Sequence, residues 1–379
     1  MTASAWSSGN RGERQEQASE ASKVAASGNL FEAFEQVAGE AMSNPLLELG
    51  DGTFRTYGQM LDRTAQLSNL LCDQGVRPGD RVAVQVEKSA EALFLYLACL
   101  RAGAVFLPLN TAYTAHELDH FFQDAAPSLI VCDPAKKDVL AGRPSVGEAR
   151  VLELDDNGRG ELAGLADNAS LTFATVPRDA EDLASLIYTS GTTGRAKGAM
   201  LSHRAILSNA RTLVRYWGFS AADVLLHMLP IYHVHGLFVA CNTLMLAGGR
   251  MIFLPKFEAA LACQLLPRAT SMMGVPTFYT RLLNCTEFNG EAVRPVRLFI
   301  SGSAPLLPET FVAFERVTGQ HILERYGMTE CGMNTSNPLD SVRKAGTVGL
   351  PLPEIEVRVC DEAGAPVEAG EPGIVEVRG

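Results

Sequence analysis

The sequence predicts an α/β fold with two βαβ-type subdomains, whose mixed or parallel sheets are flanked by helices, plus a small β-rich subdomain. Two observations support this prediction. Along most of the chain, short apolar strands alternate with helices, and such alternation builds parallel sheets through right-handed crossovers. From Gly346 onward, apolar and polar residues alternate between Gly and Pro turns, which is typical of β-structure.

The first subdomain is predicted over residues 29–182. Gly75 and Gly103 stand where two of its helices should end, because glycine favours the left-handed backbone that closes a helix. Its expected elements are, in order, a helix at 57–75, a strand at 81–86, a buried helix at 89–103 and a strand at 128–133. The segment 134–182 is charged and irregular, so we expect loops and edge structure there.

The second subdomain is predicted over residues 183–345, and the β-rich subdomain over 346–379. A strand at 183–190 should run into a glycine-rich loop, and Ser202 is a plausible N-cap for the helix that follows it. The remaining expected elements are that helix at 202–218 and short strands at 250–255, 271–276 and 296–302.

Composition and charge narrow the class of protein. A chain of 379 residues with 47% hydrophobic and 20% charged residues is too long for one compact core. A net charge of -11 argues against a nucleic-acid partner, and no apolar run is long enough for a membrane span. Eight cysteines without a CxxC pair suggest reduced thiols in a cytoplasmic protein.

The first 28 residues are polar and rich in small side chains. They lack the apolar core of a secretory signal, and their glutamates fit a mitochondrial transit peptide poorly. We therefore expect residues 1–28 to form a disordered tail.

The stretch YTSGTTGRAKG, residues 188–198, has the composition of an anion-binding loop. Its glycines let successive N–H groups turn inward, while Lys197 adds charge and the serine and threonines add hydroxyl donors. The next helix is expected to contribute its positive N-terminal end. The loop is not a Walker A motif, because Lys197 lies between Ala196 and Gly198. A flexible surface linker is the alternative.

Four motifs in order carry a family resemblance: YTSGTTGRAKGAMLSH at 188–203, LPIYHVHG at 229–236, SGSAPL at 301–306 and YGMTE at 326–330. Together they resemble the adenylate-forming superfamily of acyl-CoA synthetases, adenylation domains and luciferases. The resemblance covers nearly everything from Leu30 to Gly379. It implies that residues 29–379 form the large AMP-binding domain, with ATP, Mg²⁺ and coenzyme A as cofactors or co-substrates.

The resemblance also implies roles for individual residues. It assigns the ATP phosphates to Thr189, Ser190, Gly191, Thr192, Thr193, Gly194 and Lys197. It assigns adenine and AMP to Gly302, Ser303, Ala304, Pro305, Arg325, Tyr326, Gly327, Met328 and Thr329. It gives catalytic roles to Lys197, Thr329, Glu330 and His233, with Glu330 as the Mg²⁺ ligand. Without the other motifs, Glu330 would be interpreted as a solvated loop residue.

The histidines of YHVHG form a second candidate group. His233 and His235 would point to the same side of an extended segment. A metal pair is one interpretation, but no third ligand lies close in sequence, so a pair of histidines in the core or in a polar pocket is the simpler one. The resemblance places this stretch beside the carboxylate to be activated.

Arg281 is the most informative single residue for the identity of the acid. It follows Pro276 in an expected helix and could be an ordinary surface arginine. The sequence around the motifs resembles that of malonyl-CoA synthetases, which activate malonate and sometimes methylmalonate. The resemblance then implies that Arg281, with His233, His235 and Ser303, binds the substrate carboxylate.

The resemblance implies a ligase that makes an acyl-adenylate and then an acyl-CoA. Relatives continue past the strand at the end of this sequence into a small lid domain, which the 379 residues lack. We therefore expect weak ATP binding and impaired turnover from this chain. Two alternatives remain: a ligase for another short or medium-chain acid, and a non-catalytic nucleotide-binding remnant. The oligomeric state is not predicted.

Overall fold

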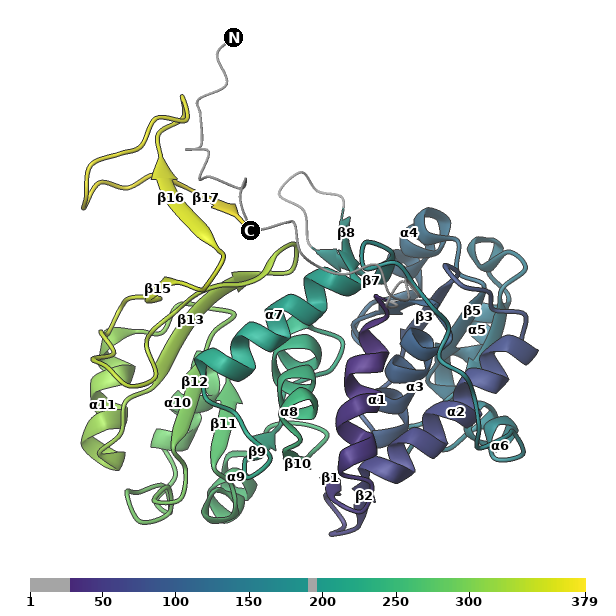
Figure 1. Cartoon of the computed structure of the whole chain (residues 1–379), viewed down its shortest axis with the longest axis horizontal. Coiled ribbons are helices and arrows are strands. Elements are labelled where there is room, and N and C mark those ends of the chain that lie inside the picture. Colours follow the sequence, from purple (N-terminus) through teal and green to yellow (C-terminus); the bar gives the residue numbers. More distant parts are fainter. Residues whose placement is uncertain (1–27, 190–195) are drawn as a thin grey trace, which may run out of the picture.

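The computed structural model describes residues 28–189 and 196–379. In these residues the strands form two large sheets and one separate hairpin (Figure 1). The nine-stranded sheet has the order β15-β14-β13-β12-β11-β9-β10-β1-β2, and the six-stranded sheet has the order β6-β5-β3-β4-β7-β8. The α/β architecture predicted from the sequence is confirmed.

The six-stranded sheet is parallel except at one edge, where β8 runs antiparallel to β7. Its strands are β3 (Arg81–Gln85), β4 (Val105–Pro108), β5 (Leu129–Cys132), β6 (Arg150–Glu153), β7 (Leu183–Thr189) and β8 (Lys197–Ser202). Strand β6 lies within the segment 134–182 and forms the edge of the sheet beside β5, so it supplies the expected edge structure.

The nine-stranded sheet has a parallel centre and antiparallel edges. Its strands are β1 (Pro45–Leu49), β2 (Phe54–Thr56), β9 (Val224–His227), β10 (Arg250–Phe253), β11 (Ser271–Gly274), β12 (Leu298–Ser301), β13 (Leu323–Met328), β14 (Gly332–Ser336) and β15 (Leu350–Pro351). Strands β16 (Glu356–Cys360) and β17 (Ile374–Arg378) pair only with each other in the named sheets. Residues on both sides of position 183 thus contribute strands to each large sheet.

Helices fill the space between the two sheets and cover their outer faces (Figure 1). They are α1 (Leu30–Glu40), α2 (Tyr57–Asp73), α3 (Ala90–Arg101), α4 (Ala115–Ala125), α5 (Lys137–Ala141), α6 (Glu161–Ala166), α7 (His203–Tyr216), α8 (Asn242–Ala247), α9 (Ala259–Leu265), α10 (Pro276–Leu283) and α11 (Pro308–Thr318). A π-helical segment, His235–Cys241, leads directly into α8.

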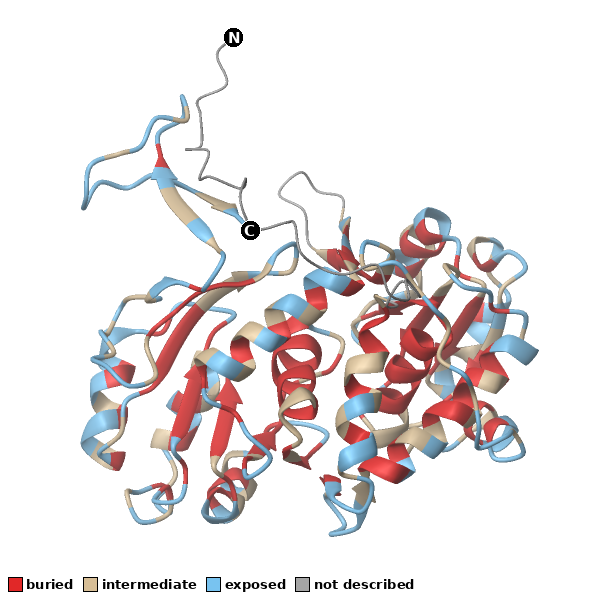
Figure 2. Ribbon diagram, viewed as in Figure 1, coloured by how far each residue is buried: buried red, intermediate tan, exposed pale blue. Residues whose placement is uncertain are grey.

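Helix ends predicted from the sequence carry capping residues in the structure. Ser202 caps α7 by accepting a hydrogen bond from the Ala205 N–H, and Thr56 forms a capping box with Gln59 at the start of α2. Gly103, just after α3, has a φ of +71° that favours glycine. Helix α3 and the α8 segment are almost entirely buried between the sheets, as Figure 2 shows in red.

Two local expectations from the sequence are wrong. The glycine-rich loop is followed by the strand β8 and only then by α7, so no helix begins directly at the loop. The YHVHG stretch is a turn that enters the π-helical segment, so it is not extended. Strands β7 and β8 pair antiparallel, with Thr189 opposite Lys197.

The predicted disordered tail lies outside the described residues, apart from Gly28, whose N–H donates to the Arg178 carbonyl. All eight cysteines are described and none forms a disulfide. No helix in residues 28–189 or 196–379 combines the length and apolar character needed to cross a membrane.

Candidate functional site

A cavity of about 390 Å³ lies at the carboxyl ends of the central strands of the nine-stranded sheet. Crevices at this edge of a parallel sheet are the usual ligand sites of α/β proteins. The cavity gathers residues from the β9–α8 connection, the loop after β12 and strand β13. Of the residues singled out from the sequence, those that line it are His233, His235, Ser303, Arg325, Gly327, Met328 and Thr329.

Arg325 supplies a buried positive charge to this cavity. It is 3% exposed, and its Nε and Nη2 atoms have no hydrogen-bond partner among the described residues. Burial lowers the pKa of Arg325 to about 10, so the guanidinium stays charged at neutral pH. A buried charge without a partner is costly, and a bound anion would relieve that cost. Arg325 therefore marks the cavity as an anion site.

Ser303 and His235 lie together in the same cavity. The His235 Nδ1 atom is 3.1 Å from the Ser303 hydroxyl, and the His235 Nε2 atom is buried without a partner. Burial, and then the charge of Arg325, hold the pKa of His235 well below its usual value. A neutral imidazole and a hydroxyl can each donate one hydrogen bond to a ligand oxygen.

The loop that carries Ser303 is held by strand β13. Oε1 of Glu324 accepts a hydrogen bond of 2.9 Å from the Leu306 N–H. Ser303 itself has a φ of +69°, which is uncommon for a residue with a side chain. Gly302 lies against the guanidinium, because a Cβ at this position would be 2.4 Å from the Arg325 Cζ atom. The loop is thus shaped around Arg325.

Thr329 and Glu330 form the turn between β13 and β14. Helix α7 contacts both β14 and β8, so this turn and the ends of β7 and β8 lie along the same helix (Figure 1). The Asn209 side chain fixes the arrangement, donating to the Met333 carbonyl at 3.0 Å and accepting from the Met333 N–H at 3.1 Å.

Of the residues predicted to bind the ATP phosphates, the structure describes only two. Thr189 and Lys197 face each other across the β7–β8 pair, and Lys197 is exposed. The other five, Ser190, Gly191, Thr192, Thr193 and Gly194, lie outside the described residues.

Several predicted residues do not line the cavity. Gly302, Ala304, Pro305, Tyr326 and Glu330 lie within two residues of a lining residue in sequence but are not among the lining residues. Glu330 is exposed on its turn. In the described parts of the chain no group of three or more His, Cys, Asp or Glu side chains could hold a metal ion. A single carboxylate fits a Mg²⁺ ion that takes its other ligands from phosphates and water.

Arg281 also lies outside the residues that line the cavity. It is exposed on α10, with its guanidinium 4.9 Å from the centre of the Phe257 ring. Arg325, predicted to bind adenine or AMP, lines the cavity together with Ser303 and His235. The local signal is a charged pair, Glu324 and Arg325, that follows Leu323 in the buried first half of strand β13.

Comparison with known proteins places the chain in one family. The model of the AMP-binding enzyme family matches residues 34–379. The malonate–CoA ligase of Arabidopsis thaliana is 31% identical over 375 residues, covering 89% of this chain and 62% of the relative. The mitochondrial malonate–CoA ligase of Mus musculus is 32% identical, covering 86% of this chain and 58% of the relative. The chain thus spans about three fifths of the length of these curated relatives.

A solved structure is more similar still. ATP-bound MatB from Rhodopseudomonas palustris is 50% identical, with a TM-score of 0.89, covering 93% of this chain and 70% of that one. A feruloyl-CoA synthase of Amycolatopsis is 32% identical, covering 86% of this chain and 65% of the relative. Overall similarity to curated relatives therefore does not by itself distinguish malonate from an aromatic acid.

Proposed function

The chain belongs to the AMP-binding enzyme family, and from that premise we propose that it activates malonate with ATP for transfer to coenzyme A. Methylmalonate, with one added methyl group, is a second acid of the same class. The single observation that carries the choice of a diacid is Arg325, a buried cation that lines the cavity and whose Nε and Nη2 atoms have no hydrogen-bond partner among the described residues.

The second carboxylate of malonate matches the polar groups around Arg325. A guanidinium can hold a carboxylate through two parallel hydrogen bonds. Ser303 and the neutral His235 line the same cavity, where each can donate a further hydrogen bond to that carboxylate. A monocarboxylic acid with an alkyl or aromatic tail would leave the buried charge unpaired, so the pocket should discriminate against it.

The proposed reaction has two steps. In the first, a carboxylate oxygen attacks the α-phosphorus of ATP, and the bond to pyrophosphate breaks. In the second, the sulfur of coenzyme A attacks the acyl carbonyl, and AMP leaves with the electron pair of the C–O bond. Both reactants of the first step are anions, so positioning and positive charge supply most of the rate enhancement.

The chain's own residues have defined tasks in this scheme. Lys197 and the glycine-rich loop hold the β- and γ-phosphates, Thr329 contacts the α-phosphate, and Tyr326 stacks on adenine. His233 flanks the carboxylate that reacts, and burial lowers its pKa, which favours the neutral imidazole. Glu330 would hold Mg²⁺, which supplies neutralisation of phosphate charge when bound.

Arg281, which is exposed on α10, keeps its proposed role as a second carboxylate ligand. The two arginines make a matched pair for the decisive experiment. Malonate-dependent pyrophosphate release is measured for the chain fused to the C-terminal part of R. palustris MatB, in wild type, Arg325→Met and Arg281→Met. We expect Arg325→Met to raise the KM for malonate about 100-fold, and to raise the KM for butyrate far less.

Three outcomes would contradict the proposal. Equal use of malonate, acetate, butyrate and ferulate by wild type would remove the diacid preference. An unchanged malonate KM in Arg325→Met would remove the role of Arg325. ATP binding without acid-dependent pyrophosphate release by the fusion would favour a nucleotide-binding protein. The same assay on the 379-residue chain alone tests the expected impairment.

The eight free cysteines support a further proposal, that the protein works in a reducing compartment such as the cytoplasm. Small molecules are its proposed partners, and neither a nucleic acid nor a membrane is among them.

A further inference from the structure

Resting on the proposed function, we propose that the buried pair Lys88 and His227 is a wall that limits the ligase to short acids. The pair lies between the cavity of about 390 Å³ that contains Ser303, His235 and Arg325, here called the acid cavity, and a second, larger cavity lined by residues of both halves of the fold. With the wall in place, an acyl chain longer than that of a small diacid has no room to extend.

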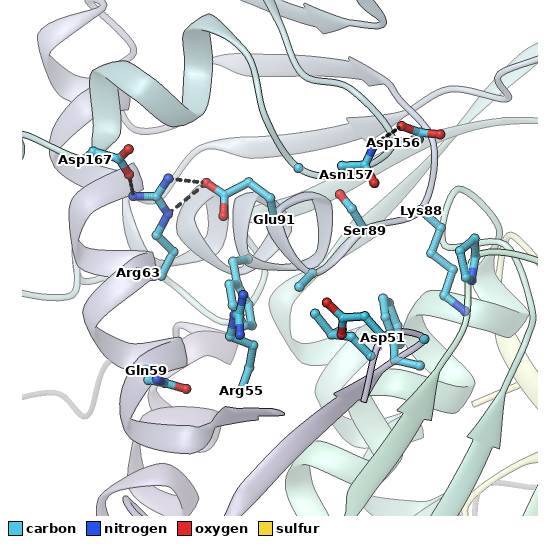
Figure 3. Close-up of a pocket in the computed structure, with 17 residues that line it drawn as sticks. Asp51, Arg55, Gln59, Arg63, Lys88, Ser89, Glu91, Asp156, Asn157 and Asp167 are labelled. Atoms are coloured by element: carbon cyan, nitrogen blue, oxygen red, sulfur yellow. Dashed lines mark hydrogen bonds and ion pairs between the residues drawn. The ribbon is translucent and has the colours of Figure 1, made fainter. Parts of the chain in front are cut away.

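The second cavity has a volume of about 570 Å³ and is distinct from the acid cavity. Lys88 lies at one side of it, and Arg63 with Asp167 lies at the opposite side (Figure 3). Phe253, at the end of β10, also lines it. No residue lines both cavities, although both open at carboxyl ends of strands. Something must therefore separate them.

His227 is the residue that spans the separation. Its Nε2 atom is 2.9 Å from the carbonyl of Gly236, which lines the acid cavity. On its other side, its Nδ1 atom is 2.6 Å from the Nζ atom of Lys88, which lines the second cavity. Its ring centre is 5.2 Å from that of Phe253. One side chain thus touches the lining of both cavities.

The hydrogen bonds of this pair assign its protonation. Lys88 donates to the His227 carbonyl at 2.9 Å and has the Nδ1 atom as its other partner. Nδ1 then accepts, and Nε2 carries the proton that is donated to Gly236. Burial and the charge of Lys88 keep the pKa of His227 well below its usual value, which agrees with a neutral ring.

An acyl chain could pass only by breaking these contacts. Lys88 is 5% exposed, and its ammonium lies 4.2 Å from the centre of the Phe253 ring. An alkyl chain inserted here would leave buried donors and an acceptor unsatisfied, which is strongly unfavourable. The wall therefore excludes long chains by chemistry as well as by volume.

The test removes the wall and asks whether longer acids enter. The double variant Lys88→Ala/His227→Ala is compared with Lys88→Met, which keeps the volume at position 88 and loses the charge and the hydrogen bonds to His227. Pyrophosphate release with malonate, butyrate and octanoate is measured in the same fusion protein. We expect the double variant to gain at least tenfold in kcat/KM for octanoate, while Lys88→Met gains little. If the double variant does not fold, the single His227→Ala variant takes its place with the same expectation.

The outcomes of this experiment distinguish the proposed ligase function from the proposed wall. If wild type and the double variant both use malonate but neither uses octanoate, the wall is overturned and the ligase assignment stands. An equal octanoate gain in Lys88→Met, or octanoate use by wild type, also overturns the wall. If no acid supports pyrophosphate release by wild type, the proposed function fails and the wall fails with it. Octanoate binding to the double variant by calorimetry, absent in wild type, would support the wall independently of turnover.

Discussion

At the residue scale, the acid cavity depends on one unusual arrangement, a charged guanidinium packed on a glycine. Gly302 leaves space that the Arg325 side chain fills, since a Cβ there would meet the Cζ and Nη1 atoms at 2.4 and 2.5 Å. The conformation of Arg325 is therefore set by its neighbour as well as by its own strand. A methyl group should be enough to disturb it.

We expect Gly302→Ala to weaken malonate binding about tenfold or more, because the guanidinium must move out of line with Ser303. The loss should be specific to the acid, with ATP affinity and the melting temperature changed much less. Calorimetric titrations of malonate in the presence of an ATP analogue that cannot be cleaved between the α- and β-phosphorus, and of that analogue alone, measure both effects. Unaltered malonate affinity would show that the contact does not position Arg325.

Lys88 gives a prediction about pH. Burial lowers the pKa of Lys88 to about 7, whereas the unfolded side chain titrates near 10.5. Between these values the unfolded chain binds the extra proton, so the contribution of Lys88 to stability is lost as pH falls from about 10 to 7.

Relative to Lys88→Met, which cannot titrate, wild type should gain about 1–3 kcal/mol of unfolding free energy between pH 7 and pH 9. Urea unfolding of both proteins at the two pH values measures the difference. A constant difference between wild type and variant would mean that Lys88 keeps an ordinary pKa.

At the element scale, helix α1 is anchored to the rest of the fold through its first turn. The Leu30 N–H donates to the His203 Nδ1 atom at 3.1 Å, and the Asn29 side chain donates to the Leu100 carbonyl at 2.8 Å. These contacts join α1 to the start of α7 and to the end of α3. The first residues of the helix thus depend on a histidine that must stay neutral.

His203 makes this attachment sensitive to acid. Burial, and then the nearby charge of Arg178, lower the pKa of His203 to about 4. The stability that neutral His203 contributes is complete above the pKa of the unfolded state, about 6.5. It is lost as pH falls from there through the pKa of the folded state, about 4. We expect wild type to lose about 1–2 kcal/mol between pH 7 and pH 5 through this group.

The variant His203→Gln, which cannot titrate, should lack that part of the loss. Hydrogen exchange of the α1 amides at pH 5 and pH 7 locates the effect. Faster exchange across α1 at pH 5 in wild type alone is expected, and identical pH dependence in the two proteins would contradict the assignment.

At the scale of the whole molecule, one hydrophobic core joins the two sheets. The cluster includes strand residues of the six-stranded sheet such as Val82, strand residues of the nine-stranded sheet such as Met251, and the helices between them. Two smaller clusters lie on the outer faces. Since the central cluster is shared, neither sheet should unfold alone.

We therefore expect a single unfolding transition for residues of both sheets. Trp217 is fully buried in the shared core, and Trp6→Phe leaves it as the only tryptophan in the sequence. In that variant, the urea midpoints from tryptophan fluorescence and from far-ultraviolet circular dichroism should coincide. Separate midpoints would show that the sheets are independent units.

Much of the fold was predictable because its signals are local. The helices at 57–73, 90–101 and 203–216 follow from apolar spacing and from caps such as Ser202. The strand β8 was missed because a hairpin depends on pairing across the loop, and glycine-rich segments lead equally often into helices. The YHVHG turn was missed for a similar reason, since only its neighbours prevent it from extending.

The site was predictable in its members but not in its geometry. The motifs identified Ser303, His233 and His235, which line one cavity. That Arg325 lines the same cavity while Arg281 is exposed on α10 could not be predicted, because a strand residue shows which face it occupies only once its neighbouring strands are known. The Lys88–His227 pair had no signal in the sequence, as neither residue belongs to a recognisable motif.

By itself, the sequence determined the order and kind of elements and the residue types available for phosphate and carboxylate chemistry. These depend on periodicity, capping and composition, which act over a few residues. Only the tertiary structure decided which of them meet. Ser303 reaches His235 across 68 positions, and Lys88 reaches His227 across 139, because crossovers bring the carboxyl ends of distant strands to one edge. Burial at that edge then shifts pKa values, as it does for His235, Lys88 and Arg325, which no local pattern encodes.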